Sequence, residues 1–172
     1  MFDYFWEIFK NPSIQYIMEK TLVILKPSAL QRKLIGEIIN RFEKKGLILC
    51  GMKMMQLDDA LLSEHYAHLS EKPFFNRVKS AMMTSPVIVT CWKGIDVVQI
   101  IRNLTGVTNG RLAQIGTIRG DYSMSYQENI VHTSDSIENA EIELARFFNE
   151  NEIFDYKIGN LQFTYSDEEL EQ

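Results

Sequence analysis

Short apolar runs that alternate with stretches of helical spacing constrain this fold more than any other feature of the sequence. Residues 21–27 and 86–92 are apolar on both faces, which predicts strands buried in the middle of a sheet. Residues 47–57, with a bulge at Gly51, and residues 129–132 form two further predicted strands. Because these strands alternate with helical segments, the pattern favours an α+β ferredoxin-like βαββαβ sandwich with added helices, or a doubly wound sheet.

The helical segments carry apolar residues three and four positions apart. One predicted helix begins near Leu34 and stops before Gly46, a residue type that commonly follows the end of a helix. Asp135 with Glu138 resembles a capping box at the start of the last helix. The other predicted helices run from Asp58 or Asp59 to Leu69, from Pro73 to about Met83, and from Ile95 to Leu104.

Composition excludes several classes of protein. The chain has 172 residues, of which 45% are apolar and 24% are charged, as in ordinary globular proteins. Its net charge of -5 gives no reason to expect nucleic acid or a membrane as a partner. No apolar run reaches the roughly 18 residues of a membrane span. The two cysteines, Cys50 and Cys91, form no C-x-x-C pair, so we expect no disulfide framework and a reducing, cytoplasmic setting.

The two ends of the chain differ from the middle. Residues 1–19 form an aromatic extension, which is either a short helix docked on the domain or a segment that precedes a true start at Met18. They lack the basic region and cleavage site of a signal peptide. We assign residues 20–165 to one domain and residues 166–172 to an acidic, frayed tail. Alternating apolar residues just before that tail predict a strand-like segment at Leu161, Phe163 and Tyr165.

A long segment with little periodicity, from Thr105 to Gln127, carries the first signs of chemistry, because such loops in compact domains are usually functional or disordered. Within it, Arg119 lies between two glycines, where a guanidinium fork and close backbone approach suit a phosphate. Arg102 lies near the end of a helix and Lys26 at the end of a strand. Stabilisation of the helix dipole explains Arg102, and solvation explains Lys26, as well as a functional role does. The sequence contains neither a P-loop nor a G-x-G-x-x-G turn.

The chain holds three histidines. His65 and His68 have no acidic or cysteine partner at metal spacing, and we interpret them as surface or partly buried helix residues. His132 ends a strand shortly before a helix N-terminus, which suits an arriving phosphoryl group. From spacing alone, a packing role is the commoner outcome for such a histidine. If Glu143 points inward, its carboxylate can fix the imidazole tautomer and leave the other nitrogen free to attack.

Taken together, six stretches of the sequence resemble the nucleoside diphosphate kinase family. They occur in the order and spacing of that family, and the combination of H-x-S-D-S with GTIRGD is highly specific. The stretches are TLVILKP (21–27), LQRKLIGEIINRFEKKGL (30–47), HYAHLSEKPFF (65–75), GVTNG (106–110), GTIRGDY (116–122) and NIVHTSDSIENAEIEL (129–144).

The resemblance implies a ferredoxin-like fold with a four-stranded antiparallel sheet and a helical hairpin over a nucleotide cleft. It also implies a ping-pong reaction, in which a nucleoside triphosphate, usually ATP, phosphorylates a histidine and a nucleoside diphosphate then removes the phosphoryl group. This reaction maintains the pools of NTP and dNTP. By motif position His132 is the nucleophile, and Ser134 and Glu143 orient it. The residues implied to contact nucleotide are Lys26, Tyr66, Phe74, Arg102, Thr108, Arg119 and Asn129.

The family further implies Mg²⁺, held mainly by nucleotide phosphates and not by a defined protein site. It implies a homo-oligomer, either a tetramer or a hexamer built from dimers, with no membrane and no specific nucleic acid as partners. Phe74 stacked on the base would give broad nucleotide specificity, since every base has an aromatic face. Asn129 and His132 would face opposite sides of an ideal strand, so we predict that the strand ends or bends between them.

Three positions depart from the family pattern. Gly110 and Ile115 stand where prolines are usual, and Ser28 replaces a common acidic residue. Losing two prolines raises loop entropy in the unfolded chain and lowers stability modestly.

Two functions other than a kinase are possible alternatives. A non-catalytic nucleotide- or partner-binding member conflicts with the complete set of site residues, and a nucleic-acid module conflicts with the net charge of -5.

Overall fold

A computed structural model describes residues 17–170 and contains one four-stranded sheet. The strands are β1 (Met18–Leu25), β2 (Ile48–Met55), β3 (Val87–Ile95) and β4 (Val131–Thr133). Their order across the sheet is β2-β3-β1-β4, and every neighbouring pair is antiparallel. The predicted four-stranded antiparallel sheet is therefore confirmed, and the doubly wound alternative, which needs parallel strands, is wrong.

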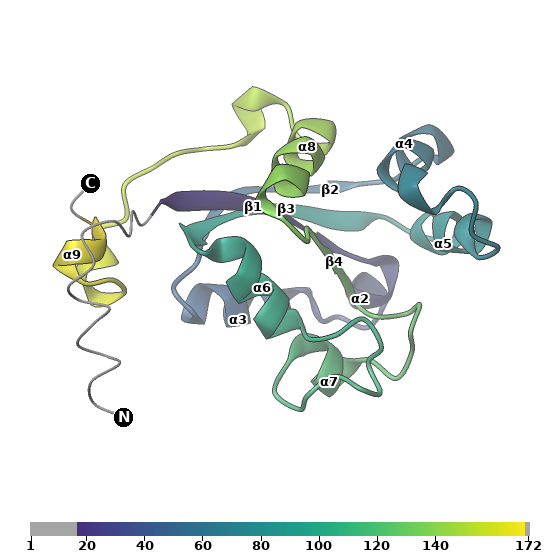
Figure 1. Cartoon of the computed structure of the whole chain (residues 1–172), viewed down its shortest axis with the longest axis horizontal. Helices are drawn as coiled ribbons and strands as arrows, with labels where there is room; N and C mark the ends of the chain where they lie inside the picture. Colours follow the sequence, from purple (N-terminus) through teal and green to yellow (C-terminus); the bar gives the residue numbers. More distant parts are fainter. Residues whose placement is uncertain (1–16, 171–172) are drawn as a thin grey trace. The chain divides into compact units, whose positions relative to one another are not determined.

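Helices cover both faces of this sheet. Figure 1 shows α3 (Ile35–Lys44) and α6 (Val97–Thr105) against one face, and α8 (Ile137–Phe147) against the other. Since α3 connects β1 to β2 and α6 connects β3 to β4, these elements form the βαββαβ unit of a ferredoxin-like fold. The helices of the compact unit added to it are α8, which follows β4, and α2 (Pro27–Gln31), α4 (Asp59–His65), α5 (Phe75–Met82) and α7 (Ile118–Tyr122), with a 3-10 turn at Ala67–Leu69.

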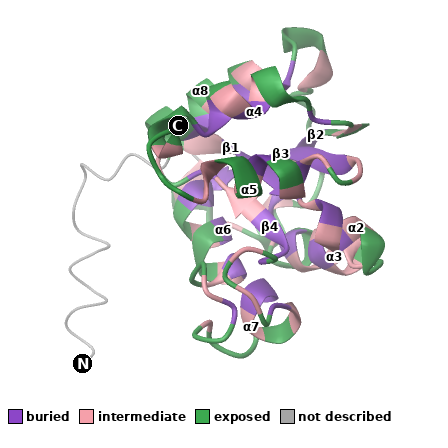
Figure 2. Ribbon diagram, turned by 90° about the vertical axis from the view of Figure 1, so that its right-hand side faces the viewer, coloured by how far each residue is buried: buried purple, intermediate pink, exposed green. Residues whose placement is uncertain are grey.

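The core follows from the alternation of side chains along β1. Val23 and Leu25 point to the face covered by α3 and α6, where they join a fully buried cluster. Phe42 of α3 meets Trp92 of β3 edge-to-face there, with ring centroids 5.1 Å apart. The intervening Ile24 is equally buried and points to the opposite face, toward α8. Figure 2 shows the buried strands between partly exposed helices.

Local signals placed several boundaries correctly. Asp58 caps α4 by accepting a hydrogen bond from the Leu61 backbone N–H. The predicted bulge is confirmed, because the β2–β3 register shifts between Leu49 and Gly51. A side chain at Gly51 would meet the Glu152 carbonyl oxygen at 2.8 Å, so the close approach of this backbone requires glycine.

Other local predictions were wrong. Ser136, and not an Asp135–Glu138 capping box, begins α8 by accepting a hydrogen bond from the Asn139 N–H. Pro27 does not extend the first strand but starts α2, where its fixed φ and missing N–H are tolerated. The fourth strand is shorter than predicted and starts only at Val131.

Residues 18–156 form one compact unit, and residues 157–170 belong to a second one, which is described by itself. In the second unit the predicted strand-like alternation is wrong. Residues Leu161–Phe163 form a 3-10 turn with Phe163 exposed, and Asp167–Leu170 form the short helix α9.

The predictions for residues 1–16 lie outside the described residues, and the division at 1–19, 20–165 and 166–172 stays a prediction. Between residues 17 and 170, no helix is long and apolar enough to cross a membrane.

Candidate active site

A cleft of about 740 Å³ brings together residues that are distant in sequence. Its walls come from the end of β1, the segment between α4 and α5, the end of α6, the long loop and β4. His132 lines this cleft, and so do all seven residues that the motifs assigned to nucleotide contact: Lys26, Tyr66, Phe74, Arg102, Thr108, Arg119 and Asn129. Ser134 and Glu143 are not among the lining residues and contact His132 or each other instead.

A sharp turn lets Asn129 and His132 share the cleft. Ile130 has a φ of 72°, and the Val131 N–H donates to the Asn129 carbonyl oxygen at 2.8 Å. A β-branched residue in the left-handed region is strained by roughly 1–2 kcal/mol. The strain is held because Ile130 is fully buried and its carbonyl accepts a hydrogen bond from the Lys26 N–H at 2.9 Å. The predicted bend is confirmed.

The orientation of His132 follows from its strand partner. It pairs with Ile24 of β1, so both side chains point toward α8. On that face His132 Nε2 lies 2.9 Å from Glu143 Oε1, and the Ser134 hydroxyl donates to Glu143 Oε2 at 2.6 Å. Because a carboxylate only accepts, this contact places the ring proton on Nε2 and leaves the lone pair on Nδ1.

Glu143 is ionised in this arrangement. Burial raises the pKa of its carboxyl, but the hydrogen bond and charge of His132 and the hydroxyl of Ser134 outweigh burial. The net effect lowers the pKa of Glu143 to about 2. At neutral pH the carboxylate therefore holds the imidazole in one tautomer.

His65 was missed as a member of this site. The prediction of a surface or partly buried residue holds for exposed His68 and is wrong for His65, whose side chain is 1% exposed. Its ring packs edge-on against His132 with centroids 4.6 Å apart, and its Nδ1 lies 3.8 Å from Glu143 Oε1. Burial lowers the pKa of His65 to about 3, so the ring is neutral. A usable signal was its position on the apolar stripe of α4, after Leu62.

Lys26 and Asn129 are held together at the end of β1. The Lys26 ammonium donates to Asn129 Oδ1 at 2.6 Å, while the Asn129 amide donates to the carbonyl oxygens of Thr108 and Tyr126. Burial, reinforced by the charge of Arg119 and opposed by Glu128, lowers the pKa of Lys26 to about 8. The protein therefore neutralises the positive charge of Lys26 only in part, and this charge is available to an added anion.

Arg119 plays a structural part that the motif did not predict. Its guanidinium donates to three backbone carbonyl oxygens: to Gly106 at 2.6 Å, to Val131 at 2.9 Å and to Asn129 at 3.2 Å. Burial and the neighbouring charge of Arg102 lower the pKa of Arg119 to about 10. Arg102 is exposed, and its guanidinium makes no hydrogen bond within residues 17–170, so its whole fork is available to an anion.

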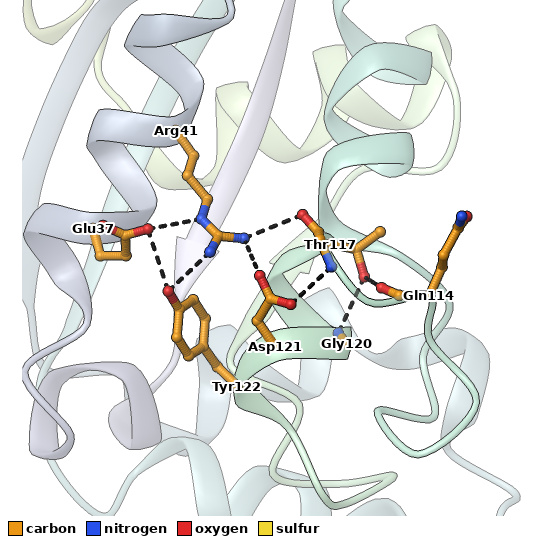
Figure 3. Close-up of polar contacts among 8 residues, drawn as sticks. Glu37, Arg41, Gln114, Thr117, Gly120, Asp121 and Tyr122 are labelled. Atoms are coloured by element: carbon orange, nitrogen blue, oxygen red, sulfur yellow. Dashed lines mark hydrogen bonds and ion pairs between the residues drawn. The ribbon is translucent and has the colours of Figure 1, made fainter.

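A second arginine ties the long loop to α3, and its role was also missed (Figure 3). Arg41 pairs with Glu37 one turn away at 2.8 Å and with Asp121 of α7 at 2.7 Å. It also donates to the Tyr122 hydroxyl, while Asp121 accepts from the Gly116 N–H at 2.7 Å. The spacing of Glu37 and Arg41 was a visible signal for an ion pair on one helix, but not for its partners on the loop.

Comparison with known proteins gives concordant results. The family model described as nucleoside diphosphate kinase matches residues 19–153. The nucleoside diphosphate kinase of Parabacteroides distasonis is 66% identical over 153 residues, which cover 89% of this chain and all of that protein. The one of Rhodopirellula baltica is 43% identical over 88% of this chain and all of that protein.

Solved structures agree in fold. A halophilic nucleoside diphosphate kinase from Halobacterium salinarum in complex with CDP superposes with a TM-score of 0.85 at 39% identity, over 87% of this chain and all of that chain. The apo enzyme of Encephalitozoon cuniculi superposes with a TM-score of 0.83 at 41% identity, over 86% of this chain and 99% of that chain.

Proposed function

The chain belongs to the nucleoside diphosphate kinase family, and we propose that His132 is the residue that carries the phosphoryl group in its reaction. Members of this family are phosphotransferases that bind nucleotides and move the terminal phosphate of a nucleoside triphosphate to a nucleoside diphosphate. One observation carries the assignment to His132: its Nε2 is held at 2.9 Å by Glu143, in a cleft lined by basic side chains.

In the first half-reaction the lone pair on His132 Nδ1 attacks the terminal phosphorus of the triphosphate. The bond from that phosphorus to the bridging oxygen breaks, and the nucleoside diphosphate leaves with the electron pair. Glu143 accepts the hydrogen bond from Nε2–H and stabilises the positive charge that develops on the ring. In the second half-reaction a terminal oxygen of another nucleoside diphosphate attacks the phosphohistidine, and the nitrogen regains its lone pair.

The remaining residues position the nucleotide. Phosphoryl transfer depends on alignment and charge neutralisation. Lys26 and Arg102 supply cations, and Arg119 adds its charge while holding the loop through three carbonyl contacts. The proposed contacts of Tyr66, Thr108 and Asn129 with phosphate or ribose, and the stacking of Phe74 on the base, rest on their positions in the same cleft.

Mg²⁺ fits this cleft as an ion held mainly by the phosphates. Glu128 and Asp135 are the two carboxylates among the described lining residues, where basic side chains outnumber them. These two would approach the ion directly or through water, since Mg²⁺ prefers oxygen donors and keeps part of its water shell. When bound, the ion neutralises phosphate charge.

The assignment of His132 is tested by a matched pair of variants. His132→Gln should lower phosphate exchange between ATP and several nucleoside diphosphates by about 10³-fold or more, because the nucleophile is gone. His68→Gln removes an exposed histidine and serves as the control. After treatment with labelled ATP, the wild type and His68→Gln should carry an acid-labile phosphate, and His132→Gln should carry none. Normal exchange by His132→Gln would refute the assignment.

We also propose a homo-oligomer built from dimers, located in the cytoplasm. β2 lies at an edge of the sheet and exposes Met52 and Met54, which supports pairing between two copies along that edge. Both free cysteines are buried, as suits a reducing compartment. Light scattering of the purified chain distinguishes a monomer from a tetramer or hexamer.

A further inference from the structure

Three potential metal ligands meet behind the cleft. His65, His132 and Glu143 each offer one ligand atom, and these atoms all lie within 4.8 Å of one another. We propose that they bind a divalent cation of the zinc class, and that the bound ion suppresses phosphoryl transfer. The binding rests on the geometry of the cluster, and the suppression rests on the proposed function of His132.

The donor set suits zinc. Two imidazole nitrogens and one carboxylate oxygen are a combination that zinc commonly takes, with a water as fourth ligand. Metal–ligand bonds of about 2.0–2.2 Å place the ligand atoms of a tetrahedral ion roughly 3.4 Å apart. The distances from Glu143 Oε1 to His132 Nε2, 2.9 Å, and to His65 Nδ1, 3.8 Å, lie on either side of that value. The two imidazole nitrogens lie within 4.8 Å of each other, so binding requires the rings to move closer together around the ion.

His65 supplies the independent evidence for a ligand. Both of its ring nitrogens are buried and have no hydrogen-bond partner within residues 17–170. An unsatisfied buried polar group destabilises a protein by about 1–3 kcal/mol, whereas a phenylalanine of similar shape would fill the same place without that penalty. A metal bond to one nitrogen satisfies the ring, and His65 already points at Glu143 and His132.

The same donors discriminate against Mg²⁺. That ion requires near-octahedral oxygen coordination and gives up its water reluctantly, so two imidazoles are poor ligands for it. The proposed site is thus separate from the one for the ion that accompanies the nucleotide.

Suppression follows from the tautomer of His132. A neutral imidazole has one ring proton, which Glu143 keeps on Nε2. A cation can bind Nε2 only after the proton has left that atom and exposed its lone pair, and in the neutral ring the proton is then carried by Nδ1, which it reaches through solvent. With Nδ1 protonated, the attacking lone pair is absent. The ion also takes the carboxylate of Glu143 as a ligand.

Binding is measured with Co²⁺, a spectroscopic substitute for Zn²⁺, and with Zn²⁺ by calorimetry, on the full chain without nucleotide. The wild type should bind one ion per chain with the intense visible absorption of four-coordinate Co²⁺. His65→Phe should lose that absorption and bind Zn²⁺ at least about tenfold more weakly, while His68→Phe should retain both. Weak octahedral absorption in the wild type, or an unchanged spectrum in His65→Phe, would overturn the site.

A third measurement does not depend on whether His65→Phe folds. Long-range ¹H–¹⁵N spectra of the wild type resolve the tautomers of its three histidines. Zn²⁺ should shift the His65 and His132 rings, move the His132 proton from Nε2 to Nδ1, and leave His68 unchanged. A response confined to His68 would contradict the proposal.

Suppression is measured as the rate of phosphate exchange at excess Mg²⁺, with free Zn²⁺ set by a metal buffer. The wild-type rate should fall in proportion to occupancy, and His65→Phe should keep its own zinc-free rate. An unchanged wild-type rate at full occupancy would overturn suppression. Failure of the proposed function would give a different result: the metal would still bind, but His132 would carry no phosphate.

Discussion

The two halves of the cleft are built in different ways. The histidine half, residues 131–147, holds the proposed nucleophile His132 through contacts among its own side chains: His132, Ser134 and Glu143 lie within one strand–helix unit. The loop half, residues 106–130, contains only the five-residue helix α7. Its conformation depends on Arg119, which binds backbone carbonyls at or next to both ends of this segment, and on Arg41 of α3, which binds Asp121 from a distant part of the chain.

This difference separates the half proposed to carry out the phosphoryl transfer from the half proposed to bind the nucleotide. The histidine half takes its geometry from β-sheet pairing and from a buried helix face, so its atoms are positioned to the precision that an attacking nitrogen needs. The loop half buries Ile118 and Ile130 in the core and is otherwise held by charged hydrogen bonds, which are strong when complete and costly when one partner is lost. Variants in the two halves should therefore fail differently.

The largest effect is expected from Arg119→Ala in the loop half. It leaves three carbonyl acceptors without their donor, and the free energy of unfolding should fall by roughly 3 kcal/mol or more. Urea denaturation measures this change. Arg102→Ala removes an exposed arginine and should change stability by less than about 0.5 kcal/mol. Equal losses in the two variants would show that the loop does not depend on Arg119.

Glu143→Gln tests the histidine half, where we expect a loss of reaction rate. An amide can donate to Nε2 and so stabilise the wrong tautomer, which should lower the rate by about 10²-fold, or about 2.7 kcal/mol of barrier. Steady-state exchange assays should show the loss mainly in kcat. A loss confined to KM would mean that Glu143 serves binding and not the alignment of His132.

The same residue gives a pH dependence. The pKa of Glu143 is lowered from 4.5 to about 2, so its stabilising contribution is complete above the unfolded value. It is lost as pH falls from about 4.5 toward about 2. The free energy of unfolding of the wild type should therefore decline more steeply across this range than that of Glu143→Gln.

The sequence predicted these two halves unequally. Apolar periodicity located the strands and helices, and strand geometry predicted the bend that the left-handed Ile130 makes. The contacts of Arg119 and Arg41 were missed, because a guanidinium can bind any carbonyl and only the tertiary fold selects which one. His65 was misjudged for the same reason: its burial depends on α4 packing beside His132, not on its neighbours in sequence.

Gly110→Pro tests how closely the loop half is packed, with a smaller expected effect. An added Cβ at Gly110 would clash with the Ser123 carbonyl oxygen, and proline also removes the N–H that donates to the Ser125 carbonyl oxygen. We expect a loss of about 2 kcal/mol in the free energy of unfolding, although proline is usual here in the family. Unchanged stability would mean that the loop rearranges freely at this point.

Ile115→Pro should give the smallest effect and the opposite sign. Gln114 to Thr117 form a turn closed by a hydrogen bond from the Thr117 N–H to the Gln114 carbonyl oxygen, with Gly116 at a φ of 93°. That is the type II arrangement, in which proline is favoured at the position that Ile115 occupies. Ile115 is exposed, and within residues 17–170 its N–H makes no hydrogen bond.

Thermal and urea unfolding of Ile115→Pro should therefore show a gain of about 0.4–1 kcal/mol, because the unfolded chain loses entropy. Ile115→Ala, which removes the same side chain without fixing φ, is the control and should show no gain. Two prolines of the family pattern are absent from this loop, yet the expected outcomes are opposite. If Ile115→Pro raises the free energy of unfolding and Gly110→Pro lowers it, the loop is already ordered by Arg119 and Arg41, and it accepts proline only where the turn geometry suits that residue. A loss of stability in Ile115→Pro would show instead that the turn relies on freedom at this position.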